Sequence, residues 1–176
     1  MVIVERVLKV APALCLDLDG TVRRSKSGAE FIAGPEDVEV FPDVEAKLWE
    51  YRDKGFLILG VSNQGGVAHG FKTSARSRAE VEATAAAFTR NPFQLVKCCF
   101  HDARGKVEPY AHRSLLRKPS YGMLAIAEQD FFAAGYVVEW DRSLFVGDRQ
   151  EDRECALGAG IAFEWAWEFF GRPAPN

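Results

Sequence analysis

ALCLDLDGT, residues 13–21, is the stretch that decides the fold of this chain. Its first four residues are apolar and predict a buried strand, which ends in two carboxylates, Asp17 and Asp19. We expect the backbone to bend just past Asp17 so that both carboxylates serve one site. Gly20 supplies the conformational freedom for a bend at this point.

The two neighbouring carboxylates allow two interpretations. Carboxylates this close raise each other's pKa unless a cation or a proton lies between them. A metal-assisted nucleophile beside a general acid/base has this arrangement. The alternative is a strand that ends in an Asx-type turn, in which Asp and Gly are common.

Length and composition are those of a soluble globular protein. The chain has 176 residues, of which 48% are hydrophobic and 27% are charged, and this length suits one domain with a sizeable core. The net charge of −3 argues against a broad basic surface for nucleic acid, although a local basic cleft is compatible with it.

The N-terminal residues and the cysteines favour a reducing, cytoplasmic setting. Charged residues at positions 5, 6 and 9 interrupt the apolar core that a signal peptide needs. No apolar run approaches the ~20 residues that cross a bilayer, so we expect no membrane association. The four cysteines do not resemble a disulfide framework, and Cys15 and Cys155 lie in apolar patterns that predict buried thiols.

Apolar runs alternate with segments of helical period along the chain. Residues 101–116 are expected to be irregular, and the Pro-rich residues 171–176 are expected to be loose. Strands that alternate with helices of this length predict an α/β fold with a mostly parallel sheet covered on both faces. The predicted strands are 14–18, 56–61, 93–100, 143–146 and 161–163, and the predicted helices are 43–54, 77–89, 121–134 and 149–159.

Polar residues follow three of the predicted strands at the points where the strands end. They are the pair at residues 17 and 19, then Ser62-Asn63-Gln64, then Asp148. The carboxyl ends of parallel strands share one edge of an open α/β sheet, and ligands bind at that edge. Each group alone fits an ordinary turn, and Asp148 also fits a cap of the helix after it. Three such groups at one edge favour a site.

Four pieces of sequence, in order, resemble the haloacid dehalogenase superfamily of phosphohydrolases. They are DLDGT at 17–21, SNQ at 62–64, RKP at 117–119, and VGD at 146–148 with Asp152. The longer matches SNQGGVA at 62–68 and RKPSYGM at 117–123 are similar to its capless group. That group contains heptose bisphosphate phosphatases, histidinol-phosphate phosphatases and the phosphatase half of polynucleotide kinase 3′-phosphatases.

The resemblance implies a fold and an activity. The fold would be a three-layer Rossmann-like α/β domain with a mostly parallel sheet and no large cap domain. It would extend over residues 1–176 with a catalytic core at about 11–170. Asp17 would be the nucleophile that forms an aspartyl-phosphate, Asp19 the general acid/base, and Lys118 the cation that neutralises charge on the phosphoryl oxygens.

The resemblance also implies a metal and its ligands. Mg²⁺ would be held by Asp17, Asp148 and the main-chain carbonyl of Asp19, and Asp152 would support it through water or through hydrogen bonds to its ligands. The substrate would be bound by Thr21, Ser62, Asn63 and Arg117.

Cys99-Phe100-His101 matches the first half of a zinc site found in some of these relatives. A closed tetrahedral site needs four ligands, and Ser114-Leu115-Leu116 stand where a Cys-x-Cys pair is expected. Asp102 and His112 could substitute, but neither has the family spacing. We therefore expect no structural Zn²⁺. The basic residues of 101–116 suit an anionic substrate, with a solvated charged loop as the alternative.

The segments that could contain a cap domain are short, so we expect an open site. Residues 21–43 have room for a flap only, and residues 63–117 are filled by one helix, one strand and a loop. We expect a Mg²⁺-dependent phosphomonoesterase that acts on a small sugar phosphate such as D-glycero-D-manno-heptose 1,7-bisphosphate. We also expect a monomer or a small homo-oligomer.

Two other functions fit the same residues. An open site also accepts the phosphate at a nucleic-acid 3′ end, as in a polynucleotide 3′-phosphatase, although the chain contains no kinase P-loop. Aromatic residues between 163 and 170 could stack bases, but at near-helical spacing they are more typical of a core or of a partner surface. The last alternative is a non-catalytic module that binds phosphorylated ligands.

Overall fold

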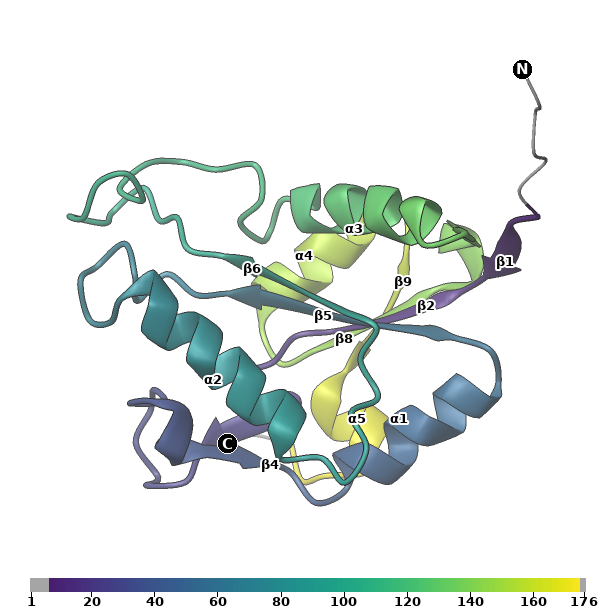
Figure 1. The fold of residues 1–176 in the computed structure, drawn as a ribbon, viewed down its shortest axis with the longest axis horizontal. Coiled ribbons are helices and arrows are strands. Elements are labelled where there is room, and N and C mark those ends of the chain that lie inside the picture. Colours follow the sequence, from purple (N-terminus) through teal and green to yellow (C-terminus); the bar gives the residue numbers. More distant parts are fainter. Residues whose placement is uncertain (1–6, 175–176) are drawn as a thin grey trace.

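The computed structural model describes residues 7–174, which form a parallel sheet between two layers of helices (Figure 1). The strand order of the sheet is β6-β5-β2-β8-β9, and every pairing in it is parallel. The predicted α/β class and mostly parallel sheet are therefore confirmed. The strands are β2 (Ala13–Leu16), β5 (Leu57–Asn63), β6 (Leu95–Cys99), β8 (Leu144–Gly147) and β9 (Ala162–Trp165).

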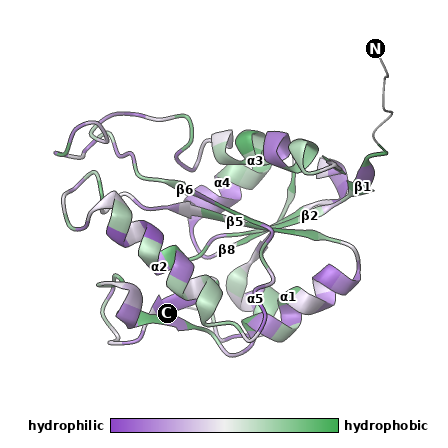
Figure 2. Cartoon of the chain, viewed as in Figure 1, coloured by the Kyte–Doolittle hydropathy of each residue, from purple (hydrophilic) through white to green (hydrophobic). Residues whose placement is uncertain are grey.

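Helices cover both faces of the sheet. On one face lie α3 (Gly122–Ala133) and α4 (Gln150–Gly158), and on the other lie α1 (Val44–Asp53), α2 (Ser74–Ala86) and α5 (Ala166–Phe170) (Figure 1). The central strands are hydrophobic, whereas the helices carry polar residues on their outer sides (Figure 2).

Each face of the sheet has its own hydrophobic core. Phe131 of α3 packs with Phe145 of β8 on one face, and Leu48 of α1 packs with Ile58 of β5 on the other. Burying one such side chain contributes about 1.5–3 kcal/mol. Cys15 and Cys155 belong to the first core, as their apolar surroundings in the sequence predicted.

Two small sheets were not predicted. β1 (Lys9–Ala11) pairs in parallel with β7 (Tyr136–Val138), and β3 (Arg23–Ser25) pairs antiparallel with β4 (Val38–Val40). Three-residue strands are too short to show a hydrophobic period. The hairpin β3–β4 and the turn η1 (Pro35–Asp37) occupy the segment expected to form a flap, and within residues 7–174 no cap domain is present.

Most element boundaries lie within two residues of the predicted ones. The exception is α2, which begins at Ser74 because the Thr73 hydroxyl accepts the backbone N–H of Arg76 at 3.1 Å. The capping role suggested for Asp148 is wrong. The N-cap residue of α4 is Arg149, whose N–H is accepted by the Asp152 carboxylate at 3.0 Å.

The aromatic segment between residues 163 and 170 forms secondary structure and contributes to a core. It forms β9 and α5, and Phe169 is buried in the core beside α1. The expectation of a loose tail is wrong at Arg172, which is hydrogen-bonded to Asp43. Residues 175–176 of that tail, and residues 1–6 of the segment on which the signal-peptide expectation depends, lie outside the described residues. Within the described part, no helix combines the length and apolar character needed to span a membrane.

Candidate active site

Three carboxylates meet at the carboxyl edge of the sheet. Asp17 follows β2, Asp148 follows β8, and Asp152 lies in the first turn of α4. Because β2 and β8 are hydrogen-bonded neighbours, the ends of the two strands come side by side. One oxygen from each of the three carboxylates lies within 4.8 Å of the others. We call these three residues the acid cluster.

Lys118 lies inside the acid cluster. Its Nζ is 2.5 Å from Asp17 Oδ1 and 2.6 Å from Asp152 Oδ1, and it donates to the carbonyl of Val61 at 2.7 Å. Burial alone would lower the pKa of Lys118, but the charges of the two carboxylates outweigh burial and raise this pKa above its usual range. Lys118 is therefore a fixed cation.

The acid cluster carries more negative charge than Lys118 neutralises. Burial raises the pKa of Asp17 well above its usual range; Lys118 opposes this shift, and the carboxylates of Asp152 and Asp148 add to it. Burial, and then the charge of Asp152, raises the pKa of Asp148 to about 6. A second cation at this position would stabilise all three carboxylates.

The composition of the acid cluster fits a hard divalent cation. Its donor atoms are carboxylate oxygens, which Mg²⁺ prefers over nitrogen and sulfur. Asp148 is 24% exposed at its side chain and is only lightly bound within the protein, by Thr21 Oγ1 at 3.4 Å and by Arg149 at 4.0 Å. Its oxygens are thus available to a metal. Among residues 7–174, no other group of three or more His, Cys, Asp or Glu side chains has this spacing.

Two glycines make room for the acid cluster. A Cβ atom on Gly20, whose φ is +93°, would lie 2.2 Å from Asp148 Oδ2. A Cβ atom on Gly147 would lie 2.4 Å from the Cβ of Asp152. Both distances are shorter than any van der Waals contact, so the two backbone positions have to be glycine for the carboxylates to come this close.

Asp19 has different partners from Asp17. Its Oδ1 accepts from Arg23 Nε at 2.8 Å, and its Oδ2 accepts from Gln64 Nε2 at 2.6 Å. Burial raises the pKa of Asp19, but the charge and hydrogen bond of Arg23 and the hydrogen bond of Gln64 outweigh burial and lower it. The side chain is 38% exposed, so Asp19 lies at the edge of the site and reaches solvent.

The four residues expected to bind substrate have unlike surroundings. Thr21 donates to Asp148 Oδ1 at 3.4 Å, and the buried Ser62 hydroxyl accepts from Gln64 Nε2 at 2.8 Å. Asn63 bonds both the N–H and the carbonyl of Lys118, each at 3.0 Å. Arg117 pairs with Asp102 at 3.0 Å and donates to the carbonyl of His101 at 3.1 Å. Asn63 and Arg117 are therefore engaged within the protein.

Two residues around Asp19 received no role from the sequence. Arg23 follows the DLDGT stretch, and nothing in its spacing indicates that it returns to Asp19. Gln64 is part of the SNQ match, but the sequence did not predict its hydrogen bond to Asp19. Arg23 lies between Val22 and Arg24, and this sequence context gives no signal for its partner.

The half-match to a zinc site forms a small cluster. Cys99 Sγ is 3.8 Å from His101 Nδ1, and the ring of His112 is 4.5 Å from that of His101 between centroids. Asp102 does not join them, since it pairs with Arg117 and His69. The expectation that no structural zinc binds stays a prediction.

The fold, the match to a family model and the named relatives together define a phosphatase of the haloacid dehalogenase-like class, a phosphoric monoester hydrolase. The chain belongs to the polynucleotide kinase 3 phosphatase family, whose model matches residues 13–170. The expected superfamily and capless fold are thereby confirmed.

Curated relatives are phosphatases of similar length. The chain is 28% identical over 155 residues to D-glycero-beta-D-manno-heptose-1,7-bisphosphate 7-phosphatase of Escherichia coli (strain K12), covering 87% of this chain and 77% of the relative. It is 25% identical over 156 residues to D-glycero-D-manno-heptose-1,7-bisphosphate 7-phosphatase of Chlorobaculum tepidum, covering 88% and 77%.

Solved structures show the same fold. A HAD-like phosphatase from Mesorhizobium loti has a TM-score of 0.75 and 27% identity, covering 91% of this chain and 74% of that chain. D,D-heptose 1,7-bisphosphate phosphatase from B. bronchiseptica, complexed with magnesium and phosphate, has a TM-score of 0.67 and 22% identity, covering 89% and 79%.

Proposed function

We propose that this chain is a Mg²⁺-dependent phosphomonoesterase that works through an aspartyl-phosphate and acts on a sugar phosphate such as D-glycero-D-manno-heptose 1,7-bisphosphate. The observation that carries the proposal is the acid cluster with Lys118 inside it, at the carboxyl edge of a parallel sheet. The names of the curated relatives support the substrate class.

The reaction has two steps. In the first, a carboxylate oxygen of Asp17 bonds to phosphorus, the bond from phosphorus to the ester oxygen breaks, and that oxygen takes a proton from Asp19. In the second, water gives a proton to Asp19 and attacks phosphorus, the bond to Asp17 breaks, and phosphate leaves. Lys118, which is bound to Asp17 at 2.5 Å, neutralises charge on the phosphoryl oxygens in both steps.

Asp17 and Asp148 would hold Mg²⁺, together with the main-chain carbonyl of Asp19, and Asp152 would fix Lys118 and support the metal from behind. When bound, Mg²⁺ supplies positive charge that offsets the repulsion between the anionic nucleophile and the anionic phosphoryl group. Thr21 and Ser62 would face the phosphoryl oxygens, whereas Asn63 and Arg117 would act through the contacts that hold Lys118 and residues 101–102.

The proposal includes a cytoplasmic setting and one catalytic domain over residues 1–176. The cysteines at 15, 98, 99 and 155 are all unpaired, which supports a reducing compartment. We propose a monomer or a small homo-oligomer with no membrane partner.

A second candidate function is removal of a phosphate from a polynucleotide 3′ end. The description of the matching family, polynucleotide kinase 3 phosphatase, names an enzyme of this kind. A chain of the Pnkp1/Rnl/Hen1 RNA repair complex shares the fold at a TM-score of 0.54 and 14% identity, over 90% of this chain and 42% of that chain. No cap domain is present within residues 7–174, so the edge of the sheet would admit a phosphate on a large molecule as well as one on a sugar.

A steady-state assay of phosphate release with Mg²⁺ tests the activity. We expect turnover of heptose bisphosphate and related sugar phosphates, and loss of turnover by more than about 10³-fold in Asp17→Asn, which removes the nucleophile. Asp141→Asn, in the exposed turn η2 (Trp140–Arg142), is the matched control and should keep full activity. A 3′-phosphorylated oligonucleotide in parallel separates the two candidates. No turnover of any phosphate ester, with Mg²⁺ binding retained, would support a non-catalytic binding module.

Metal binding has a readout that does not need activity. Mg²⁺ at 100 times its dissociation constant should stabilise the folded protein by about 2.7 kcal/mol, seen as a rise in the thermal midpoint. Asp148→Asn removes a ligand with few other contacts, so the rise should shrink, whereas Asp141→Asn should leave it unchanged. An equal rise in all three proteins would contradict the assignment of the metal to the acid cluster.

A further inference from the structure

We propose that Arg23 is a positioning residue that holds the Asp19 carboxylate in the orientation needed to protonate the leaving oxygen. The inference rests on the proposed function, because it assumes that Asp19 serves as the general acid. It concerns a residue outside the sequence matches that define the family resemblance.

The Arg23 guanidinium spans the space between Asp19 and α2. The residue is fully buried, at 0% exposure. Nε donates to Asp19 Oδ1 at 2.8 Å, and Nη2 lies 3.4 Å from Asp19 Oδ2. On the far side, Nη1 donates to the carbonyl of Glu80 at 2.8 Å and to the hydroxyl of Thr84 at 2.7 Å. The planar guanidinium is thus fixed at both ends.

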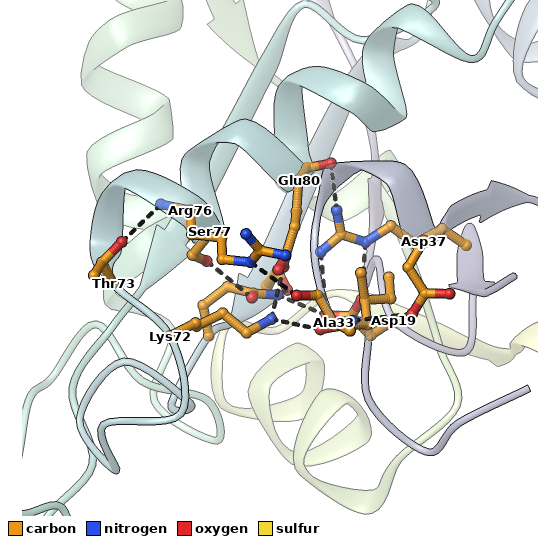
Figure 3. Close-up of polar contacts among 12 residues, drawn as sticks. Asp19, Ala33, Asp37, Lys72, Thr73, Arg76, Ser77 and Glu80 are labelled. Atoms are coloured by element: carbon orange, nitrogen blue, oxygen red, sulfur yellow. Dashed lines mark hydrogen bonds and ion pairs between the residues drawn. The ribbon is translucent and has the colours of Figure 1, made fainter. Parts of the chain in front are cut away.

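α2 provides further contacts around Asp19 (Figure 3). Ser77 donates to Gln64 Oε1 at 3.0 Å, which turns the Gln64 amide so that Nε2 reaches Asp19 at 2.6 Å. Lys72 pairs with the buried Glu80 at 2.7 Å and donates to the carbonyl of Ile32 at 3.1 Å. Asp19 is therefore oriented from one rigid helix rather than from a flexible loop.

Stability alone does not account for an arginine at this position. Removing a guanidinium from water costs several kcal/mol, and an apolar side chain of similar volume often serves a core as well or better. Arg23 is fully buried, and its only carboxylate partner within residues 7–174 is the partly exposed Asp19. The buried arginine is explained if its two hydrogen bonds to Asp19 serve the reaction.

Orientation is what a general acid needs from its surroundings. An Asp side chain at the edge of a site samples several rotamers, and only those within hydrogen-bond reach of the leaving oxygen can transfer a proton. A forked donor on both oxygens selects one rotamer before substrate arrives. Loss of Arg23 should therefore slow proton transfer more than it weakens substrate binding.

The experiment compares two kinds of phosphate ester in the full chain. A nitrophenolate leaves without a proton, whereas the alkoxide of an alkyl phosphate needs one. Arg23→Met removes the donors and keeps the apolar stem. We expect kcat on the alkyl ester to fall about 10²-fold and kcat on the aryl ester to fall by less than about threefold, with KM changed little, because acid catalysis is worth ~10²–10⁴-fold. Arg23→Lys keeps the positive charge but not the forked guanidinium. Its kcat on the alkyl ester should lie between that of the unmodified chain and that of Arg23→Met.

Two more variants complete the design. Arg24→Ala, next in β3, loses an exposed ion pair with Glu39 and should leave the ratio of the two rates unchanged. Thr84→Val frees the far end of the guanidinium without touching Asp19, and should shift the ratio in the same direction by a smaller factor. The ratio does not depend on the fraction of folded enzyme, so partial unfolding of Arg23→Met cannot imitate the result.

Failure of this inference and failure of the proposed function look different. If the unmodified chain hydrolyses neither ester, the proposed function is wrong. If it hydrolyses both, and Arg23→Met and Thr84→Val lower the two rates by equal factors, Arg23 is a purely structural residue and the inference is overturned.

Discussion

Gly147 is a residue at which the acid cluster depends directly on backbone shape. It ends β8, and α4 crosses so close to it that the Cβ of Asp152 lies 2.4 Å from where a Gly147 Cβ would be. This approach places Asp152 beside Lys118, at 2.6 Å. The absence of a side chain at Gly147, the glycine of the VGD motif, therefore permits the contact between Asp152 and Lys118.

Gly147→Ala should displace α4 and destabilise the fold. Overpacking of a tight core costs about 1–3 kcal/mol, and here it also separates Asp152 from Lys118, so activity should fall together with stability. Urea unfolding and the phosphate-release assay measure the two effects. Gly158→Ala is the matched control, because its Cβ would meet nothing closer than Tyr121 Cδ1 at 3.5 Å and alanine favours the helix. Equal stability of the two variants would contradict the steric argument.

Residue types in this site were largely predictable, and residue contacts were not. The carboxylates at 17 and 148 and the lysine at 118 follow strand ends or a motif, and the structure brings them together. The Asn63 side-chain amide was expected to bind substrate. In the structure it is hydrogen-bonded to the backbone of Lys118 instead, at 3.0 Å. A polar residue at a strand end can face a ligand or a neighbouring loop, and the sequence does not distinguish the two.

At the scale of elements, the hairpin β3–β4 takes the place of a cap domain. Its connecting residues are fastened by Asp37, which accepts the N–H of Ser27 at 2.7 Å and that of Ala33 at 3.0 Å. Arg76 of α2 adds a hydrogen bond to the Ala33 carbonyl at 2.8 Å (Figure 3). The hairpin is thus a rigid flank of the site, joined to the same helix that positions Arg23.

The contacts of Asp37 predict a pH dependence. The N–H groups of Ala33 and Ser27 lower the pKa of Asp37. The folded protein therefore binds this proton less readily than the unfolded chain, so the stabilisation is present above the usual Asp pKa of about 3.9 and is lost as the pH falls through the lower folded value. The thermal midpoint of the unmodified chain should exceed that of Asp37→Asn at pH 6, and the difference should shrink below about pH 4. A difference that is constant with pH would contradict this.

Over the whole molecule, the C-terminal segment is connected to the start of the site. The Arg172 guanidinium pairs with both oxygens of Asp43, each at 2.7 Å, and donates to the carbonyl of Thr21 at 2.8 Å. It also lies over the rings of Phe41 and Phe170, at 4.0 and 4.3 Å from their centroids. One side chain thus joins the last helix, the entry to α1 and the DLDGT stretch.

Arg172→Ala should lower the free energy of unfolding by about 1–3 kcal/mol, because hydrogen bonds to charged groups and the cation–π contacts are lost together. Urea denaturation measures the change. The matched control is Arg142→Ala, whose pair with Glu139 is exposed and is worth less than ~1 kcal/mol. Equal losses in both variants would show that Arg172 does not bind the C-terminal segment to the fold.

Asp17, Asp19, Lys118 and Asp148 are predicted as the reacting residues because short motifs resemble those of the haloacid dehalogenase superfamily. The sequence by itself determined the alternation of strands and helices and the edge of the sheet at which Asp17 and Asp148 lie. These follow from local properties, because side-chain period and strand-end composition are properties of short segments. Only the tertiary structure decided that Arg23 and Gln64 hold Asp19, that Asn63 holds Lys118, and that Arg172 reaches Thr21. Such pairs join residues far apart in the chain, such as Arg23 and Glu80, and packing of the helices on the sheet selects them.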